Sequence, residues 1–358
     1  MPVILLCCLL LLLPIEVQTI EGDLAEASLL ELEIHKQVLA LTAQQVPLLI
    51  ERASGGDIQA QCVLGVAHAR GSAVPRDEAQ AIKWLSKVAP RDVAWVQNLL
   101  GSIHRRGGNV RPDYSEAVKW FRAAADQKHP AAADNLGYMY LNGQGVRKDE
   151  AMAAHWYSVS AASGYAPAQN NLGQLYEHGM GVQKDYATAL NLYIQGVQKG
   201  LASAQNNLGA MYEAGLGVPK NYDEAVKWYR ASAEQGEPVG QNNLAFMYAR
   251  GHGVKRDFGE AAKWYARAAE SGYPPAQGRL AQLYETGRGV RLDYVVAYSW
   301  YARAAAGGHE ASKEALAELS ERMTPRQLQA ARTSLLTREH VEREQPTGVI
   351  VEKKLPVR

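Results

Sequence analysis

The feature that most constrains this chain is a sequence repeat with a period of 36 residues. A Leu-Gly or Leu-Ala pair recurs in one register, and its second member falls at positions 65, 101, 137, 173, 209, 245 and 281. A second register holds Trp at 84, 120, 156, 228, 264 and 300, and Leu at 192. A step kept without insertion or deletion is typical of arrays in which each unit packs only on its neighbours. The period therefore predicts a solenoid.

Each repeat has the pattern of two helices separated by a glycine-containing break. Leu208, Met211 and Tyr212 follow the spacing of one helix face, and residues 215–219 (GLGVP) end that helix. Asp or Asn then precedes a second helix that is rich in Ala and aromatic residues, at positions 149, 185, 221, 257 and 293. Small residues at the Leu-Gly register let the two helices approach closely. We expect a bulky side chain at that register to overpack the crossing and to cost about 1–3 kcal/mol.

The full pattern, A-x-x-x-L-G-x-x-Y-x-x-G-x-G-V-x-x-D-x-x-x-A-x-x-W-Y, resembles the Sel-1-like repeat, a relative of the tetratricopeptide repeat. The resemblance covers residues 58–309. It implies an all-α fold, a right-handed α-solenoid of seven helix-turn-helix repeats with helical caps at both ends. It also implies a non-enzymatic scaffold or adaptor that binds other proteins, although a repeat fold by itself does not specify a partner.

The chain is expected to consist of five segments, the repeat array and two segments on each side of it. Residues 1–20 are expected to be a signal peptide or a short N-terminal anchor, 21–57 and 310–340 capping helices, and 341–358 a disordered tail. The apolar run 3–13 is too short to span a bilayer comfortably and has the size of a signal-peptide core. We therefore expect export to the periplasm or the outside of a bacterial cell, with a retained membrane tether as the alternative.

Charge and cysteine content restrict the partners further. The formal net charge is only +1, so no general attraction to nucleic acid or to anionic lipid is expected. If residues 1–20 are removed, Cys62 is the remaining cysteine, and no disulfide is expected.

The sequence shows no motif for catalysis, a cofactor or a metal. It contains no zinc-protease, serine-hydrolase, phosphate-loop or paired C-x-x-C pattern. His68 and His104 lie one repeat apart, but they occupy a Tyr position and are better explained as core residues. The resemblance offers one alternative, because some secreted relatives are linked to β-lactam chemistry as enzymes or inhibitors. No nucleophile and base at a fixed spacing support it here.

Two ladders of asparagine are the candidate binding residues. Asn135, Asn171, Asn207 and Asn243 directly precede the core Leu, and Asn170, Asn206 and Asn242 lie one residue earlier. Amide side chains on the concave side of a solenoid can match the donors and acceptors of an extended peptide. The first ladder can instead bond the backbone between adjacent repeats, and the two interpretations remain open. For the second ladder we favour binding.

Three further groups complete the candidate site. Gln174, Glu177 and Glu213 fall in columns that flank the ladders on the first helices. Trp95 is the one Trp outside the repeat register, and it is either an exposed interface anchor or part of the core. The sequence thus predicts binding of a protein or an extended peptide along the first helices.

Overall fold

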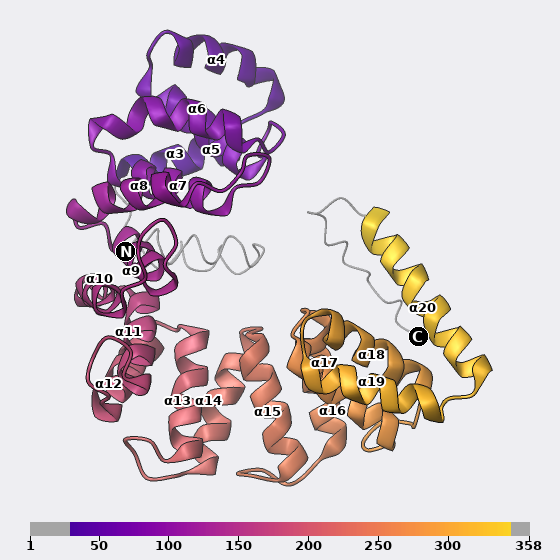
Figure 1. Ribbon diagram of the computed structural model, residues 1–358. Coiled ribbons are helices and arrows are strands. Elements are labelled where there is room, and N and C mark those ends of the chain that lie inside the picture. The colour runs from indigo at the N-terminus through magenta and orange to yellow at the C-terminus, as the bar shows by residue number, and fades with distance from the viewer. Residues whose placement is uncertain (1–28, 345–358) are drawn as a thin grey trace, which may run out of the picture. The chain divides into compact units, whose positions relative to one another are not determined.

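The computed structural model describes residues 29–344, and these form eighteen α-helices and no strand. Consecutive helices pack in pairs, which confirms the all-α solenoid of helix-turn-helix repeats (Figure 1). The helices are α3 (Leu29–Ala40), α4 (Val46–Ser54), α5 (Ile58–Arg70), α6 (Glu78–Val88), α7 (Ala94–Arg106), α8 (Tyr114–Asp126), α9 (Pro130–Asn142), α10 (Glu150–Ala162), α11 (Ala166–His178), α12 (Tyr186–Gln198), α13 (Ala202–Ala214), α14 (Tyr222–Glu234), α15 (Pro238–Arg250), α16 (Phe258–Glu270), α17 (Pro274–Thr286), α18 (Tyr294–Ala306), α19 (Glu310–Arg322) and α20 (Pro325–Glu344). Two short 3-10 helices lie at η2 (Ala43–Gln45) and η3 (Ala89–Arg91).

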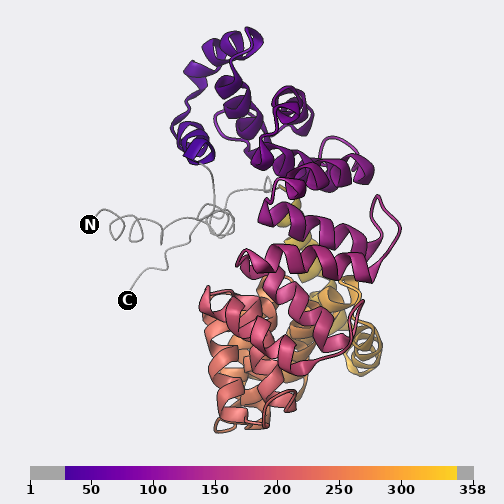
Figure 2. The ribbon, with the colours of Figure 1, turned by 90° about the vertical axis from the view of Figure 1, so that its left-hand side faces the viewer.

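The chain divides into two compact units, with the boundary inside α12, at residues 195 and 196. In unit 1 the helices from α5 to α10 follow one another in chain order, coloured indigo to magenta in Figure 2. In unit 2 the helices α13, α14 and α15 stand side by side, and α16 to α18 continue the alternation (Figure 1). We call the odd-numbered helices α5 to α19 the first helices and the even-numbered helices α6 to α18 the second helices; α19 follows the seventh repeat and continues the alternation.

In the first five repeats the helix pair closes where a first-helix glycine meets a second-helix side chain. A Cβ built on Gly137 would lie 2.8 Å from Cδ1 and 2.9 Å from Cε1 of Tyr157. Tyr157 is only 2% exposed, so its ring has little room to move. The same approach occurs at Gly65 with Leu85, Gly101 with Phe121, Gly173 with Tyr193 and Gly209 with Tyr229. The close crossing expected from the Leu-Gly register is therefore present.

The loop between the two helices of a repeat sits against the preceding repeat. Gly145, the second glycine of its loop, has φ 69°, a conformation that favours glycine. A Cβ on Gly145 would collide with the backbone carbonyl of Tyr114 at the start of α8. The equivalent contacts are Gly181 with Glu150, Gly253 with Tyr222 and Gly289 with Phe258. These loops therefore join neighbouring repeats as well as the two helices of one repeat.

A buried glutamine makes a second connection between helices of successive repeats. Gln97 donates from Nε2 to the carbonyl oxygen of Ala89 at 2.9 Å, and Gln277 donates to that of Ala269 at 3.1 Å. The last carbonyls of a helix have no partner within the helix, so these amides satisfy acceptors that burial would otherwise leave unpaired. Gln61 and Gln241 make the same bond to Ala53 and Ala233.

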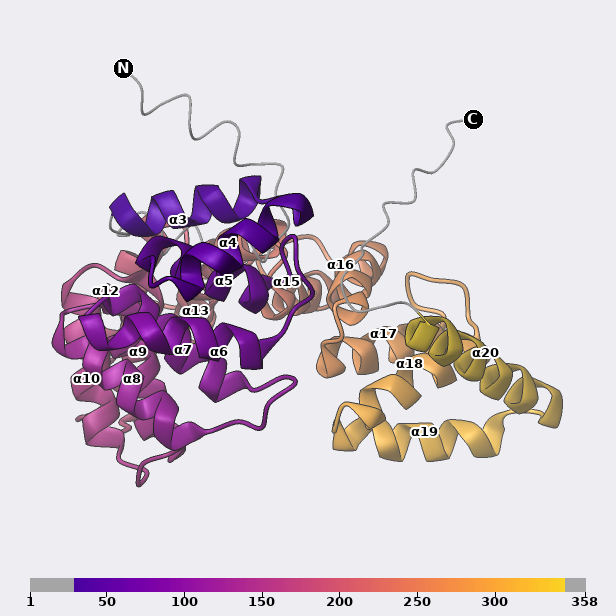
Figure 3. The same ribbon diagram turned by 90° about the horizontal axis from the view of Figure 1, so that it is seen from above.

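Helices outside the repeats lie at both ends of the described chain. At the N-terminal end, α3 buries Ile34 and Val38, whereas Leu48 of α4 stays 62% exposed. At the C-terminal end, α20 contacts α18 and follows α19, as the view in Figure 3 shows. The closing helix runs to Glu344, further than the expected end near residue 340. The expected leader (1–20) and the rest of the expected tail fall outside residues 29–344.

None of the described helices is both long enough and apolar enough to cross a bilayer. Cys62 is a buried free thiol, and no disulfide occurs within residues 29–344. Burial raises the pKa of this thiol to about 12, which makes it a poor nucleophile or metal ligand. It behaves as a small core side chain.

Candidate functional site

The asparagines before the core Leu connect neighbouring first helices through their side chains. Asn135 Nδ2 donates to Oδ1 of Asn98 at 3.0 Å. Asn171 Nδ2 donates to Oδ1 of Asp134 at 2.8 Å. Each partner lies 37 residues earlier, in the preceding repeat. The linking role that the sequence left open for this ladder is therefore present, made between side chains rather than to the backbone.

In unit 2 the same bond belongs to a short chain of amides. Asn243 Nδ2 donates to Asn206 Oδ1 at 2.9 Å. Asn206 Nδ2 donates in turn to Asn207 Oδ1 at 3.2 Å, and Asn242 Nδ2 donates to Asn243 Oδ1 at the same distance. Most of the donors and acceptors of these amides are thus used inside the protein.

Two asparagines of the second ladder are more buried than the predicted binding role requires. Asn170 is 5% exposed and Asn206 is 8% exposed. A partner cannot reach such side chains without a rearrangement. Asn242 is the exception, because it is only partly buried and lines a pocket.

The carboxylates predicted to flank the ladders hold tyrosine hydroxyls of the second helices. Tyr193 donates from its hydroxyl to Glu177 at 2.6 Å, and Tyr229 donates to Glu213 at 2.6 Å. Burial, together with the hydrogen bond and the charge of its Glu, raises the pKa of each of these two tyrosines well above the usual value. Glu177 and Glu213 therefore have a structural partner, while Gln174, one helical turn away from Glu177, is exposed.

The sixth repeat lacks the Tyr–Glu pair that the fourth, fifth and seventh repeats make, and the third repeat lacks it as well because residue 141 is Leu. The Tyr–Glu pairs join residues 16 apart, and a third such pair is Tyr301 with Glu285 at 2.8 Å. The corresponding tyrosine of the sixth repeat is Tyr265, and the residue 16 positions before it is Ala249. Within the described part of the chain, no hydrogen bond to the Tyr265 hydroxyl occurs.

The asparagine ladder ends at the same place. The partner of Asn242 in the next repeat would be residue 279, 37 positions later, and this residue is Arg279. Asn242 Oδ1 is buried and has no hydrogen-bond partner. A buried acceptor without a partner costs free energy, which makes it a marker for a ligand or an ordered water.

The residues at these departures, Asn242, Tyr265 and Arg279, line a pocket of about 490 Å³ in unit 2. First helices α13, α15, α17 and α19 provide most of its lining, and second helices α16 and α18 contribute Tyr265 and Tyr301. Figures 1 and 3 show the positions of these helices. The polar and aromatic side chains in its lining include Asn242, Phe246, Tyr265, Arg279, Gln282 and Tyr301.

Two arginines place positive charge in or near the pocket: Arg279 lines it, and Arg250 acts on Tyr265 from outside the lining. Arg279 is exposed and makes no ion pair with any residue in 29–344. Arg250 lies with its guanidinium carbon 5.4 Å from the centre of the Phe246 ring. Burial raises the pKa of Tyr265 to about 12, and the positive charges of Arg279 and Arg250 act in the opposite direction. At neutral pH the Tyr265 hydroxyl therefore keeps its proton and can donate a hydrogen bond.

Trp95 does not belong to an exposed surface. It is 6% exposed and packs in the core of unit 1, with its ring 6.2 Å from that of His35 in α3. The linker position in the sequence did not reveal that α3 covers it. Its burial removes the exposed surface on which the anchor interpretation depended.

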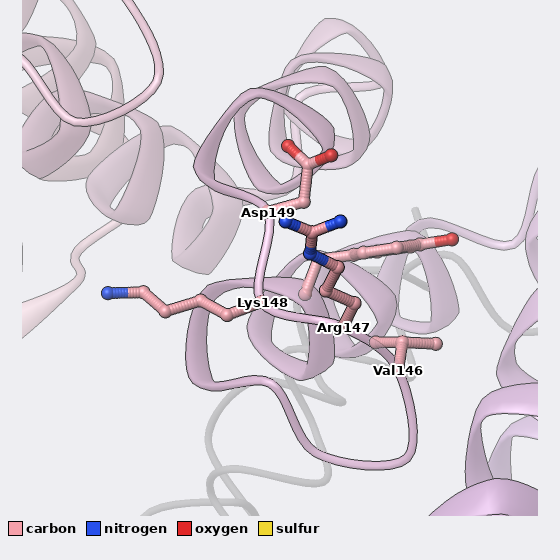
Figure 4. A pocket seen from close by; sticks show the side chains of 5 residues that line it. Val146, Arg147, Lys148 and Asp149 are labelled. Carbon is pink, nitrogen blue, oxygen red and sulfur yellow. The ribbon is translucent and has the colours of Figure 1, made fainter.

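Another hollow lies on the loop between α9 and α10, where Val146, Arg147, Lys148 and Asp149 line it with Tyr140 (Figure 4). Lys148 extends away from the other labelled side chains and pairs with Glu150 at 3.1 Å. Asp149 is already used as the N-cap of α10. This hollow therefore offers fewer free groups than the pocket of unit 2. The part of the chain that the structure describes contains no cluster of three potential metal ligands.

Comparisons with known proteins follow the same repeats. The family profile described as Sel1 repeat matches residues 58–89, 96–129, 130–165, 166–201, 202–237, 238–273 and 274–309. The crystal structure of a Sel1 repeat protein from Oxalobacter formigenes is 30% identical, with 77% of this chain and 80% of that chain covered and a TM-score of 0.64.

Two further solved structures have lower TM-scores. The protective antigen c5321 of uropathogenic Escherichia coli, described as displaying an SLR fold, is 26% identical over 87% of this chain and 92% of that chain, with a TM-score of 0.33. The immunity protein Pa5087 of Pseudomonas aeruginosa is 22% identical over 57% of this chain and 81% of that chain, with a TM-score of 0.43. The comparison with curated proteins gave no match.

Proposed function

Because the chain belongs to the Sel1 repeat family, whose members typically serve as protein-interaction scaffolds, we propose that it binds an extended segment of a partner protein in the pocket of unit 2. The segment would lie across the first helices α15, α17 and α19. The fold is generally a non-catalytic scaffold, and we assign the chain no reaction.

The observation that carries this proposal is the coincidence of two interrupted interactions in one pocket. Elsewhere in the described chain the ladder amides and several second-helix tyrosines are satisfied by side chains of the protein itself. In this pocket Asn242 Oδ1 and the Tyr265 hydroxyl have no such partner. An extended peptide carries both donors and acceptors along its backbone, so it can satisfy both groups.

The pocket also contains an apolar contact suited to a side chain of the partner. Phe246 is partly exposed on α15, with Arg250 one turn further along the same helix. Aromatic residues and arginine are enriched among the residues that dominate protein–protein binding energy. A partner segment can therefore gain both apolar burial and polar contacts at this position.

A site-specific cross-link tests the proposal. A photo-reactive phenylalanine analogue at Phe246 should form a discrete adduct with one protein in the cells that produce this chain. The matched control carries the analogue at Lys263, which is exposed on the second helix α16. If the two positions give the same adducts, or position 246 gives none, the pocket is not the binding site.

We also propose that the chain works after export, on the basis of its N-terminal sequence. The support is the apolar run 3–13, which Pro14 follows, in a segment outside the described residues. Mass spectrometry of the protein recovered from its producing cell tests this. Removal of about 20 residues is the expected result for a signal peptide, whereas an intact N-terminus in the membrane fraction would favour a tethered adaptor.

A further inference from the structure

We infer that the pocket of unit 2 binds a carboxylate carried by the partner segment, and that Arg279, Tyr265 and Asn242 are the groups that hold it. This inference rests on the proposed function, because it names the chemistry by which that same pocket recognises its partner. Arg279 is exposed and would donate to the carboxylate first. Tyr265, which is 3% exposed, and the buried Asn242 Oδ1 lie in the wall of the pocket and would become accessible through a side-chain rearrangement. Tyr265 would then donate to the carboxylate, and Asn242 Oδ1 would accept from a neighbouring N–H of the same ligand.

The charge around the pocket departs from the repeat pattern at two positions, one in the sixth repeat and one in the seventh. The first helices of the fourth, fifth and seventh repeats carry Glu177, Glu213 and Glu285 where the sixth carries Ala249. At the ladder position, Arg279 replaces the neutral asparagine of the preceding repeats. One negative charge is thus missing and one positive charge is added, which makes this part of the surface attractive to an anion.

Two carboxylates lie near this part of the surface, and one of them keeps its charge. Glu213 borders the pocket and accepts from the neutral Tyr229 hydroxyl, which leaves its negative charge in place. Arg279 and Arg250 together exceed this single charge. Glu285 accepts from the Tyr301 hydroxyl and forms an ion pair with Arg322. Arg279 has no ion-pair partner among residues 29–344, and Arg250 adds a second positive charge beside Phe246.

The hydrogen-bonding groups select among anions. Arginine can only donate, and the protonated hydroxyl of Tyr265 is positioned to donate as well, whereas Asn242 Oδ1 can only accept. A carboxylate next to a peptide N–H offers acceptors to the first two and a donor to the third. An anion without a donor group leaves Asn242 Oδ1 unpaired, and a neutral sugar leaves the charge of Arg279 uncompensated. Hydrogen bonds between an ionised donor and an ionised acceptor are about twice as strong as neutral ones, so the carboxylate gains most here.

Small probes test the chemistry without knowledge of the partner. The full chain would be titrated, with NMR detection, with N-acetyl-alanyl-alanine, with its C-terminal amide, and with N-acetyl-aspartyl-alanine amide. The two carboxylate probes share the peptide N–H but place the acid at the chain end or on a side chain. We expect at least one of them to bind about tenfold more tightly than the uncharged amide, with millimolar affinity typical of so small a ligand.

Two substitutions restore the pattern of the other repeats and should remove binding without harming the fold. Arg279→Asn would offer Asn242 Oδ1 the donor that the ladder supplies elsewhere, and Ala249→Glu would offer Tyr265 a carboxylate. Both variants should melt at or above the wild-type temperature and lose at least about tenfold in affinity for the carboxylate probe. Arg291→Asn, an exposed arginine outside the pocket, is the matched control and should bind as the wild type does.

The outcomes separate this inference from the proposed function. If the amide binds as tightly as the acids, if no probe binds below about 20 mM, or if both restored variants still bind the acid, the carboxylate assignment is overturned. Should the cross-link from position 246 persist in the restored variants, the scaffold proposal stands without the carboxylate. If the acid binds but no protein cross-links at 246, the carboxylate site stands and the scaffold proposal falls.

Discussion

Substitution of Gly137 by valine should destabilise unit 1 because the helix crossing leaves no space for a side chain. The added Cβ would lie 2.8 Å from Cδ1 of Tyr157, and its neighbouring ring atoms Cε1 and Cγ are 2.9 and 3.1 Å away. Contacts below 3.0 Å between carbon atoms require one of the two groups to shift. Tyr157 is buried and its ring is held on the opposite side by the core, so the shift must separate the helices α9 and α10.

Two opposing contributions set the size of the effect. Replacement of a mid-helix glycine by alanine stabilises a helix by about 1 kcal/mol, and by valine by roughly half as much. Overpacking of a dense core costs about 1–3 kcal/mol, with the upper end appropriate for a branched side chain against a ring. The expected net loss is therefore about 0–2 kcal/mol for Gly137→Ala and about 1.5–2.5 kcal/mol for Gly137→Val. Alanine is native at the same register at Ala245 and Ala281, which agrees with its smaller expected effect.

Urea unfolding followed by circular dichroism would measure the difference. The control is Ser158→Val on α10, next to Tyr157 in sequence but with an exposed side chain. This change should stay within about 0.5 kcal/mol of the wild type, as is usual for surface positions. If Gly137→Val unfolds at the same urea concentration as Ser158→Val, the glycine is not needed for the crossing and the packing argument fails.

Three further effects are expected. Burial lowers the pKa of His129 to about 4, and its neutral imidazole caps α9, so the unfolded chain binds a proton at pH values where the folded chain does not. The free energy of unfolding should therefore fall by about 2 kcal/mol as the pH drops from 6.5 to 4. The variant His129→Asn keeps a capping side chain, and urea titrations at the two pH values should show a smaller loss for it. Asn243→Ala should cost about 1–2 kcal/mol by thermal melting, because it leaves the buried Oδ1 of Asn206 without its donor; an unchanged melting temperature would show that the ladder is not structural. Tyr229→Phe should cost about 1 kcal/mol because Glu213 loses its hydroxyl donor. The effect of Tyr229→Phe should largely disappear in a background that carries Glu213→Ala, which has no acceptor for the hydroxyl.

The sequence predicted the fold because its period reports on packing directly. Glycine at residue 137 and tyrosine at residue 157 recur at the same spacing in later repeats, and each repeat must solve the same crossing in the same way. The helix-break glycines likewise marked the loops, since few other residues adopt the conformation of Gly145. Because seven repeats pack their two helices in a similar way, few chain topologies are compatible with the sequence.

The orientation of individual polar side chains was harder to predict. Neighbouring positions on a helix differ by about 100° around its axis, so Asn206 and Asn207 cannot be separated into buried and accessible by spacing alone. The structure buries Asn206, and its predicted binding role stays a prediction that this burial disfavours. The burial of Trp95 depends on the position of α3, and α3 lies outside the repeats, so the repeat pattern could not predict it.

The pocket was visible in the sequence only as two exceptions. The column of Glu177, Glu213 and Glu285 omits the sixth repeat, and the asparagine ladder stops before Arg279. These exceptions can be interpreted because the structure shows which side chains the glutamates and asparagines of the other repeats hydrogen-bond. Such sites can be sought in other repeat proteins. The signal is a residue that differs from those at the same repeat position, together with the side chain that those residues normally hydrogen-bond.

The contact of Gly145 with the start of α8 also limits how this chain can change its length. Because the loop of one repeat rests on the backbone of the previous repeat, an extra residue in the loop would move it off that contact and would turn every later helix pair relative to its predecessor. Insertion or loss of a whole 36-residue block keeps each loop on an equivalent backbone. Such an array can therefore grow or shrink by complete repeats far more readily than by single residues.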